Sequence, residues 1–476
     1  MRKMLTLCAI TWLALALVAC DDESQNLTVD EAAVTAELQK HLETHLMGVA
    51  SSASFVEDSE MMNSLGGEEG TEPTPSPDGG GGGEMEEGAR EFVDMLKQHV
   101  FVSSNVESKT ATSVTYRLSP EMCGTPDPEY PDDTQSCIDF LNEIPIRFVV
   151  SSPAESSYVI KVQIGTSKLN PVHFSVSEQK LGVEVDLAAA KATVEMLMNE
   201  MAEGEESPLP EVMQGRILVQ LVRNGEGDFT ATYGVLEPVH VKLEGMEFKF
   251  ASAPEALVAH LVNATKKLEL SSALGAIEIT MPGEFLQGSE MICETSPNSG
   301  SCWEESTGPT GGTFKLVSAG AAGKVTFDAA AQEKLVFSDI SLAGPITATV
   351  DGKTLFQLEL AEAFSGSIED LGETGTMSFE PKMAITIQLA LQNLVSYLDD
   401  ASELDAWMLD EELRIELAGS FETLLDTDLL KVVSGSFKLW AKSGIDVQAE
   451  AGMCVSSADV EENGHPFAGF SAVSCP

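Results

Sequence analysis

The fold class is decided by residues 346–360, which read ITATVDGKTLFQLEL. Apolar and polar side chains alternate along residues 356–360, and a period of two is typical of a strand with one dry and one wet face. Asp351 and Gly352 suit the two-residue turn of a hairpin, in which both residues need a positive φ. The sequence therefore predicts an antiparallel hairpin formed by residues 346–350 and 354–360.

Similar alternation recurs on both sides of this hairpin. Residues 217–223 and 229–235 form a second predicted hairpin around Asn224-Gly225, and residues 383–389 repeat the pattern. Further strands are expected at 114–118, 146–151, 158–164, 239–243, 324–327 and 437–441. Helical spacing and capping residues predict amphipathic helices at 89–100, 187–202, 254–268 and 401–417. We therefore expect an α+β fold, mainly antiparallel β, with a few amphipathic helices packed on the sheets.

The composition excludes several classes of protein. The 476 residues are 43% hydrophobic and have a mean hydropathy of +0.02. This supplies a core but excludes a polytopic membrane protein and a chain disordered throughout. The formal net charge is −49 and the sequence has no basic patch, so we expect no nucleic-acid partner.

Residues 20–88 differ in composition from the rest of the chain. From residue 21 to residue 88 there are 17 acidic residues and one basic residue, Lys40. The run 66–88 includes five consecutive glycines and three prolines, which can bury very little surface. We expect a disordered acidic N-terminal tether over 20–88, with a short helix within 30–50 and a low-complexity linker at 66–88.

The remaining residues, 89–476, form the expected β-rich body. A cysteine-containing loop and the glycine-rich run 308–312 interrupt the strand pattern. The body is therefore one domain, or two sub-domains that meet near 282–312.

The first residues of the chain carry an export signal. Arg2-Lys3 precedes an apolar run of about sixteen residues, which is short of the ~20 that cross a bilayer as a helix. Residues 1–19 therefore read as a cleaved signal peptide. The end of this run, Leu17-Val18-Ala19-Cys20, resembles the lipobox of bacterial lipoprotein precursors, in which a peptidase cuts before the cysteine.

This resemblance implies that Cys20 becomes the lipidated N-terminus. Several acyl chains would give a stable anchor, because each buried methylene contributes about 0.8 kcal/mol. The protein would then be exported and lipid-anchored to a bacterial envelope membrane, facing the periplasm or the cell surface. Asp21 resembles an inner-membrane retention signal of some bacteria, and the choice between inner and outer membrane stays open. The alternative is an ordinary secretory signal with an incidental cysteine.

The cysteines independently favour export. Cys8 lies in the signal peptide and Cys20 at the lipidation site, and the other six form three pairs of sequence neighbours. An oxidising compartment favours pairing, and no CxxC spacing favours zinc. We predict the disulfides Cys123–Cys137, Cys293–Cys302 and Cys454–Cys475, each closing a turn-rich loop.

The sequence contains no common catalytic or cofactor motif. GxSxG, HExxH and histidine–cysteine clusters are all absent from it, so we assign no catalytic, cofactor-binding or metal-binding residue. His41 and His45 have the i, i+4 spacing of a zinc pair, but we expect them to be surface residues of a tether helix. Residues 459–464 resemble the first half of a calcium loop, yet Phe470 stands where an EF-hand needs glutamate, so an acidic turn is favoured over calcium.

Three functions are compatible with these features. The first is a non-enzymatic, membrane-anchored extracytoplasmic lipoprotein that binds a protein partner or an apolar ligand. The second is a purely structural or surface-display lipoprotein, and the third is an unrecognised hydrolase that uses acidic residues. Met196, Met198 and Met201 share a predicted helix and are expected to fill a core rather than line a ligand pocket.

Overall fold

The protein was examined as a computed structural model, which describes residues 36–45, 94–124, 131–201, 209–225, 228–283, 288–296, 299–307, 311–328, 334–369, 375–398, 404–424, 429–457 and 464–475. The chain divides into two compact units. Unit 1 contains the described residues up to Val239 together with Ser252–Leu270. Unit 2 contains His240–Ala251 and the described residues from Ser271 onward, and the seam expected near 282–312 lies inside it. The predicted signal peptide and the linker 66–88 lie outside the described residues.

Unit 1 combines an antiparallel sheet with helices. Its helices are residues 36–45 and 94–99, η1 (Ser103–Asn105), η2 (Pro120–Cys123), α5 (Pro131–Glu143), α6 (Leu187–Met201) and η3 (Asn263–Thr265). Its strands are β1 (Val106–Lys109), β2 (Ser113–Arg117), β3 (Ile146–Ala154), β4 (Ser157–Ile164), β5 (Val172–Ser177), β6 (Lys180–Asp186), β7 (Val212–Gly225) and β10 (Ala253–Val262). Strands β8 (Asp228–Leu243) and β11 (Lys267–Leu274) contain the boundaries between the units.

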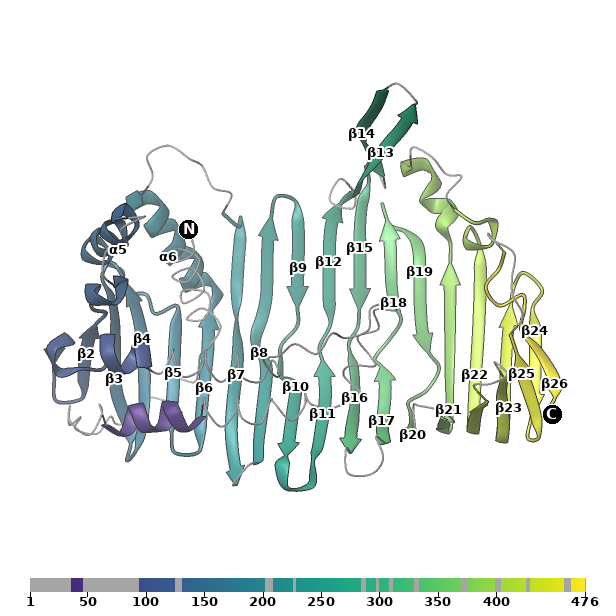
Figure 1. Ribbon diagram of the computed structural model, residues 1–476, viewed down its shortest axis with the longest axis horizontal. Coiled ribbons are helices and arrows are strands. Elements are labelled where there is room, and N and C mark those ends of the chain that lie inside the picture. Colours follow the sequence, from purple (N-terminus) through teal and green to yellow (C-terminus); the bar gives the residue numbers. More distant parts are fainter. Residues whose placement is uncertain are drawn as a thin grey trace. The chain divides into compact units, whose positions relative to one another are not determined.

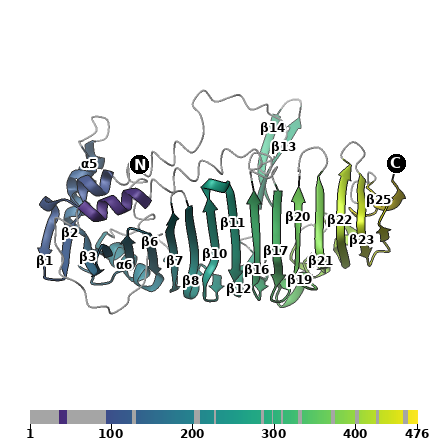
Figure 2. The same ribbon diagram turned by 90° about the horizontal axis from the view of Figure 1, so that it is seen from below.

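The sheet of unit 1 has one apolar face. Strands β1 to β7 pair in chain order, each antiparallel to the next. Val114, Val150 and Ile160 share one face across three strands and are at most 2% exposed. The helix 36–45, drawn in purple, runs across this face (Figures 1 and 2). The sheet buries its apolar side under helices, as predicted for the body.

Unit 2 is almost entirely β. Its strands are β9 (Met246–Phe250), β12 (Ile277–Pro282), β13 (Gly288–Ser296), β14 (Ser299–Thr307), β15 (Thr313–Ser318), β16 (Ala321–Asp328), β17 (Lys334–Leu342), β18 (Ile346–Val350), β19 (Lys353–Leu360), β20 (Phe364–Glu369), β21 (Thr376–Leu389), β22 (Glu411–Leu424), β23 (Leu429–Ala441), β24 (Asp446–Glu450), β25 (Met453–Ser456) and β26 (Ser471–Ser474). Three short helices, η5 (Leu391–Asn393), η6 (Val395–Tyr397) and η7 (Ala406–Met408), lie between β21 and β22. The hairpin β13–β14 extends past the ends of β12 and β15 (Figure 1).

Two ladders of antiparallel strands share β21, β22 and β23. The long ladder runs β9–β12–β15–β18–β19–β21–β22–β23–β24. The short ladder runs β16–β17–β20–β21–β22–β23–β25–β26. Strand β21 pairs with β20 through residues 376–380 and with β19 through residues 385–389. Strand β21 therefore belongs to the short ladder at one end and to the long ladder at the other.

The core of unit 2 lies where side chains of the two ladders meet. Phe337, Phe364, Phe379 and Phe421 form a chain of ring contacts across the short ladder, with centroids 5.8 to 6.1 Å apart. The same buried cluster includes Leu439 of the long ladder, which is 1% exposed. Aromatic contacts at these separations add to the apolar area that they bury.

The structure confirms a mainly antiparallel β fold with few helices. The hairpin at 346–360 is present, and its turn residues Asp351 and Gly352 have φ of 46° and 78°. The strands predicted at 217–223 and 229–235 lie within β7 and β8, but the predicted turn residues Asn224 and Gly225 belong to the end of β7, and β8 begins at Asp228. The helices predicted at 89–100 and 187–202 are present over 94–99 and in α6.

Two predicted helices are wrong. Residues 254–268 form β10, a 3-10 turn and the start of β11, and residues 411–417 of the predicted 401–417 helix belong to β22. Within this run, residues 256–262 are apolar except His260, so strand pairing with β8, rather than periodicity, decides their structure. In β22, Leu413, Ile415 and Leu417 alternate with charged residues, a period of two that the helical composition concealed.

Candidate functional site

The long ladder carries a continuous apolar face in unit 2. Residues directly opposite each other in a ladder share a face, so the register identifies its members. Ile279 of β12 lies opposite Phe248 of β9 and opposite Leu316 of β15, and Met281 lies opposite Phe314. We define the apolar strip as Phe248, Phe250, Ile277, Ile279, Met281, Phe314 and Leu316.

The apolar strip is less covered than the far end of that face. None of its seven side chains is buried, and Leu316 is 39% exposed. Further along the same face, Leu413, Leu439 and Val447 are 4%, 1% and 6% exposed. The face therefore passes from an open end at β9, β12 and β15 to a closed core at β22, β23 and β24.

The opposite face of the same strands is charged and internally paired. Lys249 Nζ lies 3.2 Å from Glu278 Oε1, and Lys315 Nζ lies 2.9 Å from Glu278 Oε2. Hydrogen bonds from Lys315 and Lys249 hold the pKa of Glu278 below its usual value. This part of the long ladder therefore has one polar side and one open apolar side.

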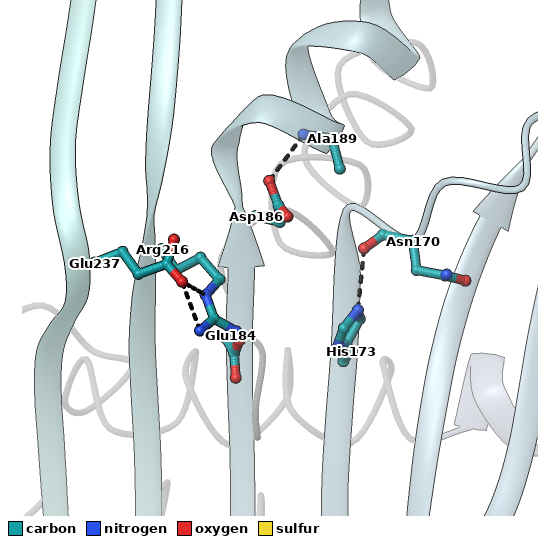
Figure 3. Close-up of polar contacts among 7 residues, drawn as sticks. All are labelled: Asn170, His173, Glu184, Asp186, Ala189, Arg216 and Glu237. Atoms are coloured by element: carbon teal, nitrogen blue, oxygen red, sulfur yellow. Dashed lines mark hydrogen bonds and ion pairs between the residues drawn. The ribbon is translucent and has the colours of Figure 1, made fainter. Parts of the chain in front are cut away.

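A polar cluster in unit 1 joins three neighbouring strands (Figure 3). Glu184 of β6 is 2% exposed and accepts a hydrogen bond from Arg216 Nη1 at 2.7 Å. The same guanidinium contacts Glu237 Oε1 of β8 at 2.7 Å. Burial opposes the charge of Arg216, but Glu184 and Glu237 outweigh it and raise the pKa of Arg216. His173 of β5 lies directly opposite Glu184 in the ladder.

This arrangement does not favour acid–base catalysis. The Arg216 guanidinium lies between the two carboxylates and contacts both, whereas the paired carboxyl groups of a glycoside hydrolase face the scissile bond from two sides. Nearby, the Asp186 side chain accepts a hydrogen bond from Ala189 N at 2.9 Å and so caps α6 (Figure 3). The cluster therefore reads as a buried ion pair that links β6, β7 and β8.

A second buried pair lies in unit 2. Glu411 is 3% exposed, and its carboxylate accepts hydrogen bonds from the backbone N–H groups of Glu412 and Ser443. Burial opposes its charge, but these bonds hold the pKa of Glu411 below its usual value. His465 Nε2 lies 3.4 Å away, and His465 Nδ1 accepts a bond from Phe467 N. These contacts attach the C-terminal disulfide loop to β22.

A shallow depression in unit 2 adds little chemistry. It is lined by Asp446, Val447 and Gln448 of β24 and by Phe470, Ser471 and Ala472. Asp446 is its one carboxylate, so it offers no acid–base pair.

The predicted disulfides are partly within the described residues. Cys123–Cys137 and Cys454–Cys475 are present. The backbones of Cys293 and Cys302 lie opposite each other in the β13–β14 ladder, and their side chains lie outside the description. Cys20, the predicted lipid attachment site, and residues 459–463 of the calcium-like run also lie outside the described residues.

The surface placement predicted for the two tether histidines is wrong. Residues 36–45 are helical, within the expected 30–50, but His41 and His45 are only 7% and 0% exposed. Their helix packs on the sheet of unit 1 through its one apolar face. The acidic composition of the segment 20–88 around it concealed this packing. Sequence reasoning also missed α5, although Pro131 followed by Asp132 and Asp133 is typical of a helix start.

The described residues contain no group of three or more His, Cys, Asp or Glu side chains placed to hold a metal ion. None of the helices in the described segments has the length and hydropathy needed to span a bilayer. No family model, no curated protein and no solved structure matches the chain.

Proposed function

We propose that the protein is an exported, non-enzymatic lipoprotein that binds the acyl chains of a lipid on the apolar strip. One observation carries the proposal: seven apolar side chains on three adjacent strands share a face, and none is buried. Exposed apolar surface on this scale costs free energy in water, about 25 cal/mol for each Å². A bound apolar ligand would remove that cost.

An acyl chain fits the strip better than a protein partner does. All seven side chains lack a charge or a strong hydrogen-bonding group. A protein interface of ordinary size carries roughly one hydrogen bond per 100–200 Å², whereas a hydrocarbon chain needs none. The charged face of the same strands is already paired internally, through Lys249, Glu278 and Lys315. The strip is therefore the side of this sheet whose apolar side chains remain partly exposed.

The sequence places such a protein where lipids are abundant. The resemblance of residues 17–20 to a lipobox supports lipidation at Cys20 and attachment to an envelope membrane, facing the periplasm or the cell surface. The charge of the chain supports repulsion from nucleic acids and from anionic surfaces. A non-enzymatic role is supported by the arginine-bridged state of the Glu184 and Glu237 carboxylates.

A pair of substitutions on β12 tests the strip. Ile279 lies at its centre, and we expect Ile279→Asn to weaken binding of a fluorescent long-chain fatty acid roughly fivefold, since about 1 kcal/mol of apolar contact is lost. Thr280→Asn is the matched control, because Thr280 is the next residue and faces the polar side opposite Lys315. Equal affinity of the two variants, at unchanged melting temperatures, would overturn the assignment of the strip.

A further inference from the structure

The helix 36–45 is attached to unit 1 by polar and apolar contacts. Tyr158 of β4 donates its hydroxyl hydrogen to Glu37 Oε2 at 2.7 Å, and Gln39 Nε2 donates to the carbonyl of Phe101 at 3.0 Å. Leu38 and Leu42 are 0% and 4% exposed. The helix is therefore part of the packed unit, although its segment is the most acidic of the chain.

Two histidines lie on the buried side of this helix. His45 Nε2 lies 2.8 Å from the carbonyl oxygen of Ser177, which can only accept, so Nε2 carries the proton. In the neutral ring His45 Nδ1 then carries no proton. Neither His45 Nδ1 nor His41 Nε2 has a hydrogen-bond partner among the described residues. Protonation of either ring in place would bury an N–H group without an acceptor.

We propose that the helix 36–45 is a pH-operated strap, which holds the N-terminal segment on unit 1 at neutral pH and releases it in acid through protonation of His41 and His45. The neutral rings fit the docked helix, and the charged rings do not. Release would uncover the apolar side chains of the sheet beneath and free the segment that follows the anchor.

The charged groups around the two rings do not cancel this effect. Burial lowers the pKa of His41, against partial opposition from Glu37 and Glu178, while Lys40 lowers it further. Burial also lowers the pKa of His45; the Ser177 carbonyl opposes this, and His41 and Arg223 add to it. Burial and the Glu37 carboxylate raise the pKa of Tyr158, so that hydroxyl keeps its proton throughout. The helix also forms an ion pair between Glu43 and Lys97, in which the side chain of Glu43 is 52% exposed.

The sign of the pH dependence follows from these directions. A histidine whose pKa is lower in the docked state favours docking fully above its free pKa of about 6.5, and docking weakens as pH falls below that value. Each such histidine makes docking up to about tenfold weaker per pH unit, and two make it up to about a hundredfold weaker.

The consequence for the membrane rests on the proposed lipid anchor at Cys20. Fifteen residues lie between Cys20 and residue 36, and 73 lie between Cys20 and residue 94, where unit 1 continues. Release of the helix would therefore replace a connection of 15 residues between the anchor and the docked body by one of 73 residues. Acid would let the body move further from its membrane.

Hydrogen–deuterium exchange of the full mature chain tests the strap. Peptides covering 36–45 and β4 are compared at pH 7.5, 6.0 and 5.0, with labelling times corrected for intrinsic exchange. We expect protection of 36–45 to fall at least tenfold between pH 7.5 and 5.0 while β4 stays protected. In the double variant His41→Gln with His45→Gln the fall should disappear, since glutamine can still donate to Ser177. His260→Gln in β10 is the control and should leave the fall unchanged.

Two further variants keep the test decisive. Leu38→Asp should release the helix at every pH and gives the exchange rate of the free segment. If the double variant does not dock at pH 7.5, the single variant His41→Gln decides. Its loss of protection per pH unit, on a logarithmic scale, should be about half that of the parent chain. Unchanged protection of the parent from pH 7.5 to 5.0, or an equal fall in the double variant, would overturn the strap. The mass of the N-terminal peptide reports lipidation of Cys20 separately, so failure of the anchor and failure of the strap are distinguishable.

Discussion

Gly435 of β23 lies opposite Gly419 of β22 in the ladder of these two shared strands. Both glycines have a positive φ, 82° and 92°. A Cβ atom on Gly435 would lie 1.9 Å from the carbonyl oxygen of Ala418, which is backbone and cannot move aside cheaply. The approach of the strands therefore requires glycine for two independent reasons, backbone conformation and space.

We expect Gly435→Ala to lower the free energy of unfolding by about 2–4 kcal/mol, because the left-handed backbone strain and the clash add. The matched control is Gly452→Ala, since Gly452 has a φ of 88° but a Cβ there would meet nothing within 4 Å. That control should lose only the backbone term, about 1 kcal/mol. Urea unfolding measures both, and equal losses would contradict the close approach.

The carboxylates that bridge Arg216 differ sharply in exposure, and this difference predicts their contributions. Glu184 is 2% exposed and Glu237 is 54% exposed. Removing a buried partner leaves part of a charge desolvated, so Glu184→Ala should cost about 2–4 kcal/mol. Glu237→Ala should cost less than about 1 kcal/mol, because water replaces that contact. Denaturant unfolding of both variants would contradict the assignment if Glu237→Ala proved the more costly.

At the scale of elements, the C-terminal loop depends on more than its disulfide. Cys454–Cys475 closes it over a sequence separation of 21, and the contact of His465 with Glu411 attaches it to β22. We expect the double variant Cys454→Ser with Cys475→Ser to lower the free energy of unfolding by about 2–4 kcal/mol in the chain-entropy account. An unchanged urea midpoint would mean that the His465 contacts alone hold the loop.

The elements also show what the sequence could and could not predict. Strands with one wet face, such as 383–389, were visible because each position alternates. The run 254–268 was not, since its apolar residues satisfy a helix or a strand equally, and only pairing with β8 separates them. The apolar strip had a signal in Ile277, Ile279 and Met281, but its exposure depends on what the fold places above it, which no local pattern records. The two tether histidines were misjudged for the same reason.

At the scale of the whole molecule, acidity and apolarity are separated. The chain carries a formal net charge of −49, and across β9, β12 and β15 the charged side chains lie on one face while the apolar strip occupies the other. High like charge keeps a protein soluble and monomeric, which permits an open apolar face that would otherwise promote association. The proposed anchor adds a location, since a lipid-attached body meets lipids first.

The most direct test of the account is native mass spectrometry of the mature chain, exported, purified without detergent and incubated with a sixteen-carbon fatty acid. The native mass should exceed the denatured mass by one or more acyl lipids, and Ile279→Asn should carry less of this excess than Thr280→Asn. A native mass equal to the denatured mass, even after incubation with the fatty acid, would contradict lipid binding on the apolar strip.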